Sequence, residues 1–243
     1  MQAWSKTDIG RKRRENQDST YVKLDYEKNI ALLVVCDGMG GVNGGSEASS
    51  LAIESFVDFI WDAVREDSSD EDVVLILRNA VTAANRAVFS RAVSDPAYMG
   101  MGTTLTAALV IGSRGYVVNV GDSRTYRIGD GIRQITEDHS LAGDLFRNGT
   151  ITREQFDSYP NKNIITRAVG TDPEVYGDIF KLALAEGEGL LLCSDGLTNM
   201  LSDEEILNVV NEAESEEAAC EKLVDLANEA GGKDNVSVVL FRA

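Results

Sequence analysis

Histidine is nearly absent from this chain, which has 243 residues and a single histidine, His139. A zinc site built from several histidines is therefore excluded, and any serine–histidine–aspartate or cysteine–histidine mechanism would depend on this one side chain. Glu137 and Asp138 directly precede His139. We interpret the histidine as a polar residue that orients this turn, and a role as catalytic base is the less favoured alternative.

Cysteine and proline are also scarce, with three residues of each. Cys36 and Cys193 lie in apolar segments and Cys220 in a helical pattern, and the chain contains no Cys-x-x-Cys pair. This distribution favours buried free thiols over metal ligands or redox centres. Because the chain has no proline-rich, serine-rich or repetitive stretch that could serve as a linker, we expect residues 1–243 to form a single domain.

Long apolar runs are missing as well. No run approaches the roughly 20 residues that span a bilayer, and residues 1–6 lack the apolar segment of a signal peptide. The net charge is −17, from 40 acidic and 23 basic residues, which argues against nucleic acid or an anionic membrane as a partner. We expect a soluble, cytoplasmic monomer that binds neither nucleic acid nor membrane.

Four aspartates occupy similar places in the pattern of apolar runs. Two apolar runs end in Asp-Gly, which puts Asp37 and Asp195 at the ends of expected buried strands. Asp122 ends another apolar run and Asp234 opens one. Magnesium or manganese needs several oxygen ligands held rigidly, which carboxylates at strand ends can supply. For any one of the four, an ordinary turn is the favoured explanation, but for the four together we favour a metal site.

Hydrophobic periodicity predicts the elements between these carboxylates. Strands are expected over residues 3–8, 20–25, 30–36, 103–111, 116–120, 125–128, 132–135, 176–183, 189–193 and 235–241, and long amphipathic helices over 48–63 and 73–92. Residues 113–115 and 129–131 predict hairpin turns. Of two later helices, one begins at a capping box of Ser202 and Glu205, and the other has apolar residues at 219, 223, 226 and 230. Strands in blocks and helices in pairs favour two stacked antiparallel sheets with helices outside.

Seven short motifs follow one another along the chain. They are segments 13–18 (RRENQD), 37–41 (DGMGG), 102–104 (GTT), 121–124 (GDSR), 137–141 (EDHSL), 194–197 (SDGL) and 233–237 (KDNVS). In this order, and over nearly the whole length, they resemble the motifs of metal-dependent protein serine/threonine phosphatases of the 2C type, in their compact bacterial form. The resemblance implies an α+β fold, a four-layer α-β-β-α sandwich of two antiparallel sheets flanked by helix pairs, and a single phosphatase domain.

The resemblance also implies a cluster of manganese or magnesium ions in a channel between the sheets. Asp37 would bridge two central ions, and the carbonyl group of Gly38 would bind the second of them. Asp195 and Asp234 would complete the protein ligands of the first ion. Asp122 would help to hold a third ion together with Asp195. Water would supply most of the remaining coordination, because these ions dehydrate reluctantly.

Arg13 and Asp18 complete the catalytic set that the resemblance implies around Asp37. Asp18 would act through metal-bound water. Arg13, five residues before Asp18, matches the phosphate-binding arginine of the family, and its planar guanidinium suits bidentate capture of phosphate. Without the other motifs, residues 11–14 would be a solvated basic loop or, less plausibly, a nucleic-acid contact. Arg14 is the alternative for the role given to Arg13.

The implied reaction is hydrolysis of phosphoserine and phosphothreonine in proteins. A hydroxide that bridges two cations is a strong nucleophile at neutral pH, so no covalent phosphoenzyme is needed. The implied partners are phosphoprotein substrates and a serine/threonine kinase whose signalling the enzyme opposes. Two alternatives are an idle module that binds phosphoproteins, which the presence of every expected aspartate disfavours, and a hydrolase of a small phosphomonoester, which the fold does not exclude.

Two departures from the family's motifs bear on the site, and one further segment matches a family feature. Met39 stands where many relatives have a histidine that protonates the leaving group, so that proton would come from metal-bound water. Gln17 replaces a frequent carboxylate, which leaves the second ion with fewer protein ligands. Residues 142–172 fall where the family has a flap beside the active site; they could gate access or screen substrates, or they could form an ordinary surface excursion.

Overall fold

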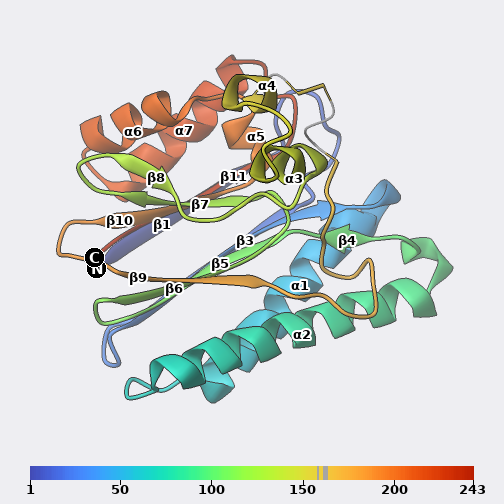
Figure 1. Cartoon of the computed structure of the whole chain (residues 1–243), viewed down its shortest axis with the longest axis horizontal. Coiled ribbons are helices and arrows are strands. Elements are labelled where there is room, and N and C mark those ends of the chain that lie inside the picture. The colour runs from blue at the N-terminus through green and yellow to red at the C-terminus, as the bar shows by residue number, and fades with distance from the viewer. Residues whose placement is uncertain (158, 161–163) are drawn as a thin grey trace.

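Two antiparallel sheets lie face to face, and a pair of helices covers the outer side of each (Figure 1). The computed structural model describes residues 1–157, 159–160 and 164–243, with side chains at all of these except 42, 43 and 157. One sheet has the strand order β1-β11-β10-β7-β8 and the other β2-β3-β5-β6-β9, with β4 paired to the end of β3. The expected four-layer α-β-β-α sandwich is therefore confirmed.

The strands and helices have the following bounds. The first sheet contains β1 (Gln2–Asp8), β7 (Arg124–Ile128), β8 (Ile132–Gln134), β10 (Gly189–Cys193) and β11 (Val236–Arg242). The second contains β2 (Asp18–Asp25), β3 (Ile30–Met39), β4 (Gly102–Thr103), β5 (Leu105–Ile111), β6 (Arg114–Val120) and β9 (Asp178–Ala183). The helices are α1 (Gly41–Ala63), α2 (Asp70–Ser94), η1 (Pro96–Tyr98), α3 (Leu141–Arg147), α4 (Arg153–Asp157), α5 (Asp195–Thr198), α6 (Asp203–Glu212) and α7 (Glu216–Glu229).

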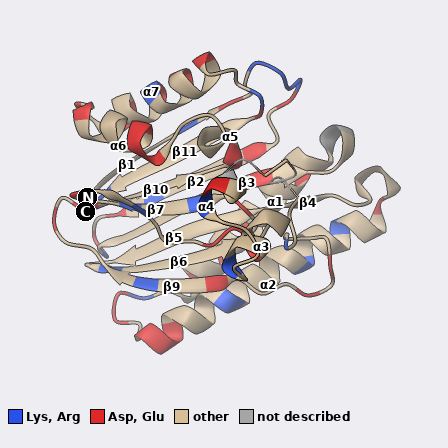
Figure 2. Ribbon diagram, turned by 45° about the horizontal axis from the view of Figure 1, so that its top comes forward, with Lys and Arg blue, Asp and Glu red and all other residues tan. Residues whose placement is uncertain are grey.

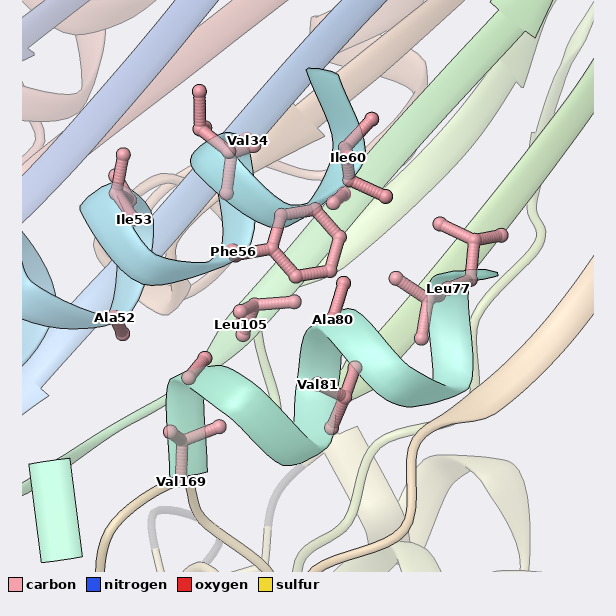
Figure 3. Close-up of a cluster of buried hydrophobic side chains, with 14 of the residues drawn as sticks. Val34, Ala52, Ile53, Phe56, Ile60, Leu77, Ala80, Val81, Leu105 and Val169 are labelled. Atoms are coloured by element: carbon pink, nitrogen blue, oxygen red, sulfur yellow. The ribbon is translucent and has the colours of Figure 1, made fainter. Parts of the chain in front are cut away.

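Buried hydrophobic side chains form three clusters, one at each interface between layers. Phe56 of α1 and Leu77 of α2 pack with Val34 of β3 on the outer face of the second sheet (Figure 3). The neighbouring Leu33 points the other way, into the cluster between the sheets, because side chains alternate along a strand. Both faces of β3 are covered, which explains its unbroken apolar run. Each fully buried side chain of this size contributes about 1.5–3 kcal/mol to stability.

Charge is spread over the outside of the sandwich. Acidic residues occur on helices of both outer layers (Figure 2), including the first turns of α2, α6 and α7. Carboxylates in these positions stabilise the positive end of the helix dipole. No helix in the part of the chain that the structure describes is long and apolar enough to cross a membrane. The three cysteines are buried and free, as expected.

The main predicted elements are present, although several boundaries differ. The turn at 129–131 and the capping box of Ser202 and Glu205 are both found. The other hairpin turn lies earlier than expected, because Arg114 already pairs with Ile111 in the β5–β6 ladder. On α7, Ala230 lies beyond the last helical residue and is exposed, so the buried face ends before it.

The two Asp-Gly motifs do not both end strands. β3 continues through Asp37 to Met39, because Gly38 and Met39 pair with Thr103 and Gly102 of β4. β10 does end before the second motif. Asp195 is the first residue of α5, whose N-cap is Ser194. The prediction of a strand ending in a carboxylate is thus wrong for Asp37 and right in outline for Asp195.

The segment expected to be a flap contains two short helices. The Ser140 hydroxyl accepts a hydrogen bond from the Gly143 amide at 3.1 Å and begins α3, and α4 follows after a turn. Residues 158 and 161–163 of this segment lie outside the described residues. Ser140, just before the segment, forms an antiparallel bridge with Ile165 inside it. This bridge holds the base of the part that contains α3 and α4.

Candidate active site

Six of the seven residues assigned to the site from the sequence line one cavity of about 310 Å³. They are Arg13, Asp37, Gly38, Asp122, Asp195 and Asp234. β3 supplies Asp37 and Gly38, and the turn between β6 and β7 supplies Asp122. α5 supplies Asp195, and the turn before β11 supplies Asp234. A larger cavity of about 560 Å³ adjoins it and shares Asp122 and Asp195, with Arg153 and Phe156 of α4 on its wall. The candidate flap thus lies beside the site.

The backbone of Asp37 is held firmly by the segment 102–104. Its amide donates a hydrogen bond to the Thr104 hydroxyl at 2.9 Å. Its carbonyl oxygen accepts hydrogen bonds from the Thr103 hydroxyl and from the Thr104 amide, each at 2.9 Å. These contacts explain the Gly-Thr-Thr motif, because its two threonines fix the backbone of the residue whose carboxylate lies in the cavity.

Asp18 does not line the cavity, although it pairs with Asp37 in the register of the β2–β3 ladder. Its side chain is buried, and Oδ2 accepts a hydrogen bond from the Ser194 hydroxyl at 2.7 Å. Its Oδ1 atom has no hydrogen-bond partner among the described residues. Burial raises the pKa of Asp18 to about 7, although the hydrogen bond from Ser194 opposes this rise.

The carboxylates of the cluster repel one another. Burial raises the pKa of Asp37 well above its ordinary value, and the negative charges of Asp18, Asp195, Asp122 and Asp234 raise it further. Burial and the charge of Asp195 also raise the pKa of Asp122. Carboxylates in this arrangement ionise together only at a cost, unless cations compensate their charge. The electrostatics therefore fit a site for divalent cations.

The donor atoms agree with this interpretation. Carboxylate and carbonyl oxygens are the ligands that magnesium and manganese prefer. Within the described part of the chain, no three acidic, cysteine or histidine side chains converge closely enough to form a complete cage. Ions that keep several waters need an open cavity with carboxylates on its walls rather than such a cage. A Cβ at Gly45 would lie only 2.7 Å from the Gly38 carbonyl oxygen and 2.6 Å from Oε1 of Gln17, so glycine leaves room where these two oxygens converge.

Arg13 reaches the cavity through an ion pair with a candidate metal ligand. Its Nη2 atom lies 2.7 Å from Oδ2 of Asp234. The Arg13 side chain is 55% exposed, so part of the guanidinium faces solvent. Arg14 lines a neighbouring cavity rather than this one. Of the two arginines weighed from the sequence, Arg13 is the one that lines the cavity with the carboxylates.

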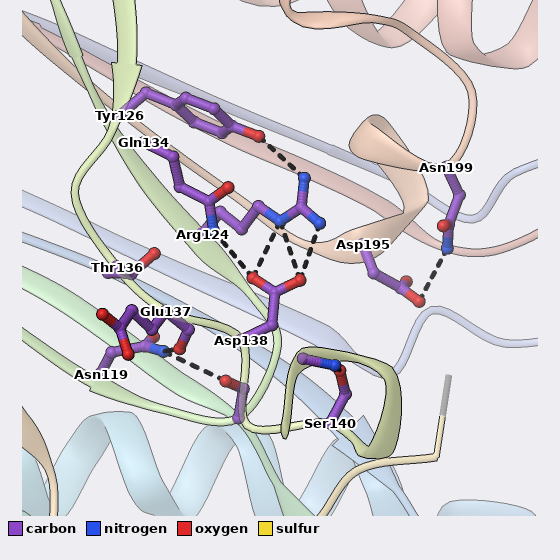
Figure 4. Close-up of polar contacts among 12 residues, drawn as sticks. Asn119, Arg124, Tyr126, Gln134, Thr136, Glu137, Asp138, Ser140, Asp195 and Asn199 are labelled. Carbon is purple, nitrogen blue, oxygen red and sulfur yellow. Dashed lines mark hydrogen bonds and ion pairs between the residues drawn. The ribbon is translucent and has the colours of Figure 1, made fainter. Parts of the chain in front are cut away.

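A second group of polar residues near Asp122 was not identified from the sequence (Figure 4). Nε and Nη2 of Arg124 donate to the two carboxylate oxygens of Asp138 at 3.0 and 2.7 Å. Tyr126 and Gln134 complete this network, with contacts of 3.1 Å to Arg124 and 2.9 Å to Asp138. The positive charge of Arg124 opposes the rise in the pKa of Asp122. The motifs 121–124 and 137–141 contained this pair, but their spacing gave no sign that it forms.

Asn199 and His139 add two further contacts. Nδ2 of Asn199 donates to Oδ2 of Asp195 at 2.9 Å (Figure 4). His139 is buried and does not line the cavity, in line with a structural role. Its ring contacts Gly121 and Asp178, however, and not the turn that it was expected to orient.

Comparisons with known proteins identify relatives over almost the whole chain. A family model described as "Protein phosphatase 2C" matches residues 10–230. The serine/threonine phosphatase stp of Listeria welshimeri is 37% identical over 241 residues, which cover 99% of this chain and 95% of the relative. The solved structure of Stp1 from Staphylococcus aureus has 35% identity and a TM-score of 0.90, covering 99% of this chain and 94% of that one. The catalytic domain of PstP, solved in complex with two manganese ions, has 35% identity and a TM-score of 0.84, covering 98% of this chain and 96% of that one.

Proposed function

The chain belongs to the protein phosphatase 2C family and is a protein serine/threonine phosphatase, and we propose that it works through divalent cations held by its carboxylate cluster. The observation that carries the proposal is the meeting of Asp37, Asp122, Asp195 and Asp234 in one cavity beside Arg13. The raised pKa values of Asp37 and Asp122 support it, because such a cluster is stable in its ionised form only with cations nearby.

Manganese or magnesium fits the cluster. Asp37, the Gly38 carbonyl, Asp195 and Asp234 would hold two central ions, and Asp122 would hold a third together with Asp195. Bound cations of this kind lower the pKa of water enough to give a hydroxide nucleophile near neutral pH, and they polarise the phosphoryl oxygens. The described residues that line the cavity include no serine, cysteine or histidine. The aspartates that line it would be engaged by the cations, so hydrolysis would proceed without a covalent phosphoenzyme.

Thr103 and Thr104 keep the carboxylate of Asp37 in place through its backbone. Asp18 would accept a hydrogen bond from a water molecule through Oδ1, the atom that has no partner among the described residues. Ser194 holds the other oxygen of Asp18 and thereby ties the second sheet to the first. The role of Asp18 would be to orient water rather than to bind an ion directly.

Arg13 would bind the phosphate group of the substrate. In the structure its guanidinium compensates the charge of Asp234. A cation bound by Asp234 would compensate that carboxylate instead, and the N–H groups of Arg13 would then be available to phosphate oxygens. Met39 lines the same cavity and has no proton to give, so the leaving serine or threonine oxygen would take its proton from water.

The substrates are phosphoproteins, in keeping with the activity for which the relatives are named. We further propose that the enzyme opposes a serine/threonine kinase, that residues 1–243 act as one monomeric domain, and that residues 142–172 serve as its flap. The position of α4 on the wall of the adjoining cavity supports the last point.

Chelation tests the metal mechanism. Hydrolysis of a simple aryl phosphate should stop when a chelator in excess removes divalent cations, and it should return when manganese is added back. Full activity in excess chelator would reject the mechanism. A chelated protein that keeps its circular dichroism spectrum and still loses activity would locate the effect in the chemistry and not in unfolding.

A further inference from the structure

The turn that carries Asp122 depends on an unusual backbone conformation at Gly121. This glycine has a φ of +105°, a region that side chains disfavour. A Cβ at this position would lie only 2.6 Å from Cγ2 of Thr104. Position 121 therefore requires glycine, which has no side chain that could stabilise the turn. The direction of the Asp122 side chain then depends on hydrogen bonds that other residues make to the Gly121 backbone.

His139 holds Gly121 at both of its backbone polar groups. The Gly121 amide donates to Nδ1 of the His139 ring at 3.0 Å. The backbone amide of His139 donates to the Gly121 carbonyl oxygen at 3.0 Å, and Nδ2 of Asn119 donates to the same oxygen at 3.1 Å. Since all of these groups are buried, losing the ring acceptor would leave the Gly121 amide without a partner.

Asp178 of β9 fixes the orientation of the ring. Nε2 of His139 lies 2.9 Å from Oδ2 of Asp178. Because Nδ1 accepts from the Gly121 amide, the neutral ring carries its proton on Nε2 and donates it to Asp178. Arg167 donates to the other oxygen of Asp178 at 2.8 Å. Burial lowers the pKa of His139 below its ordinary value, which keeps the ring neutral and able to accept at neutral pH.

We propose that His139 is a positioning residue for Asp122, acting through the hydrogen bond from the Gly121 amide to its Nδ1 atom. The inference rests on the proposed function, because it takes Asp122 to be a ligand of the third ion. His139 also lies at the base of the flap, where its carbonyl oxygen accepts a hydrogen bond from the Thr166 amide at 2.8 Å. The only histidine of the chain thus links a residue of the flap segment to the turn that carries a site carboxylate.

Two substitutions distinguish a role of His139 as hydrogen-bond acceptor for the Gly121 amide from a role in which its ring only fills a buried space. In His139→Asn, the side-chain oxygen can occupy the place of Nδ1 and accept from the Gly121 amide. In His139→Gln, the amide lies one bond farther out, toward Asp178, although the side chain is closer to histidine in size. An acceptor role therefore favours asparagine, whereas a filling role favours glutamine. The backbone contact between the two residues is present in both variants.

The test compares both variants and His139→Ala with the wild type, measuring turnover of a phosphothreonine peptide and titrating manganese into the same proteins by calorimetry. In His139→Asn we expect kcat to fall by no more than about threefold, and in the other two by about tenfold or more, with KM nearly unchanged. The glutamine and alanine variants should also bind the weakest manganese ion less tightly, as Asp122→Ala should. The thermal midpoint of each variant establishes that the compared proteins are folded, and if alanine does not fold, the asparagine and glutamine pair decides.

Turnover and manganese binding in His139→Gln that equal or exceed those in His139→Asn would overturn the positioning role. This outcome differs from failure of the proposed function, which would appear as a wild-type protein with no manganese-dependent hydrolysis. Manganese titration distinguishes failure of the positioning role from failure of the proposed function, because it reports on the third ion whether or not the peptide is a good substrate.

Discussion

Nη2 of Arg13 lies 2.7 Å from Oδ2 of Asp234, so the side chain proposed to bind phosphate is paired with a proposed metal ligand. The loop before β2 and the turn before β11 bring together two residues from opposite ends of the chain. A cation at Asp234 would weaken this pair and free Arg13 for the substrate. Binding of the cation and binding of phosphate should therefore favour each other, since such coupling is reciprocal.

Arg13→Ala should raise KM for a phosphopeptide. Loss of a charge-assisted hydrogen bond is worth about 1.5–3 kcal/mol, so kcat/KM should fall by about ten- to a hundredfold. Manganese affinity should not fall, because the variant removes a positive charge from beside a ligand. Arg14→Ala is the matched control and should behave as wild type. A defect in Arg14→Ala with a normal Arg13→Ala would move the assignment by one residue.

The metal-free protein should respond to pH through its buried carboxylates. The pKa of Asp18 is raised from its ordinary 3.8 to about 7 in the folded protein, so folding favours the protonated form. The stabilisation of the folded state by protonated Asp18 is fully present below the ordinary pKa of 3.8, and it is lost as the pH rises toward 7. In a chelator, the thermal midpoint of wild type should therefore fall more between about pH 5 and pH 8 than that of Asp18→Asn. Manganese at the higher pH should recover much of the loss. If the thermal midpoints of wild type and Asp18→Asn fell by the same amount over this pH range, the pKa of Asp18 would not be raised by folding.

Asp122→Ala should separate the third ion from the central pair. Calorimetry should still detect the central ions, because Asp37, Asp195 and Asp234 are intact. Turnover on phosphopeptides should nevertheless fall substantially, since Met39 cannot replace a water that the third ion would position. Removing a buried carboxylate with a raised pKa should not destabilise the metal-free protein at neutral pH. Normal turnover in a less stable variant would instead make Asp122 a turn residue.

Asp37→Asn should be the most damaging single substitution in the cluster, because it would weaken two ion sites at once. Both manganese binding and turnover should drop, while the fold persists. Glu217→Gln provides a matched control, since it removes an exposed carboxylate from the first turn of α7 and should leave both quantities unchanged. Near wild-type turnover in Asp37→Asn would contradict the bridging role.

The layered architecture could be predicted because its main signals are local. The unbroken apolar run of β3 and the capping box of Ser202 and Glu205 are visible in a few consecutive residues. The helical start at Gly41 was missed because the first turns of α1 are rich in glycine and carry no apolar period. A helix as short as α5 leaves no periodic signal either, so Asp195 was placed after a strand and not at a helix start.

The site itself could be predicted only as a set of residues. Strand-end positions and motif order pointed to Asp37, Asp122, Asp195 and Asp234, and the structure brings these four into one cavity. The contacts between them and their neighbours could not be predicted, because they join loops whose relative placement depends on the whole fold. The ion pair of Arg124 with Asp138 and the contact of His139 with Gly121 are of this kind.

The most direct test of metal-dependent protein serine/threonine phosphatase activity is phosphate release from matched phosphoserine, phosphothreonine and phosphotyrosine peptides, with manganese and with chelator. We predict release from the phosphoserine and phosphothreonine peptides in manganese, little from the phosphotyrosine peptide, and none from any peptide in chelator. Release that does not depend on manganese, or manganese-dependent hydrolysis of small phosphomonoesters with no release from either peptide, would contradict the account.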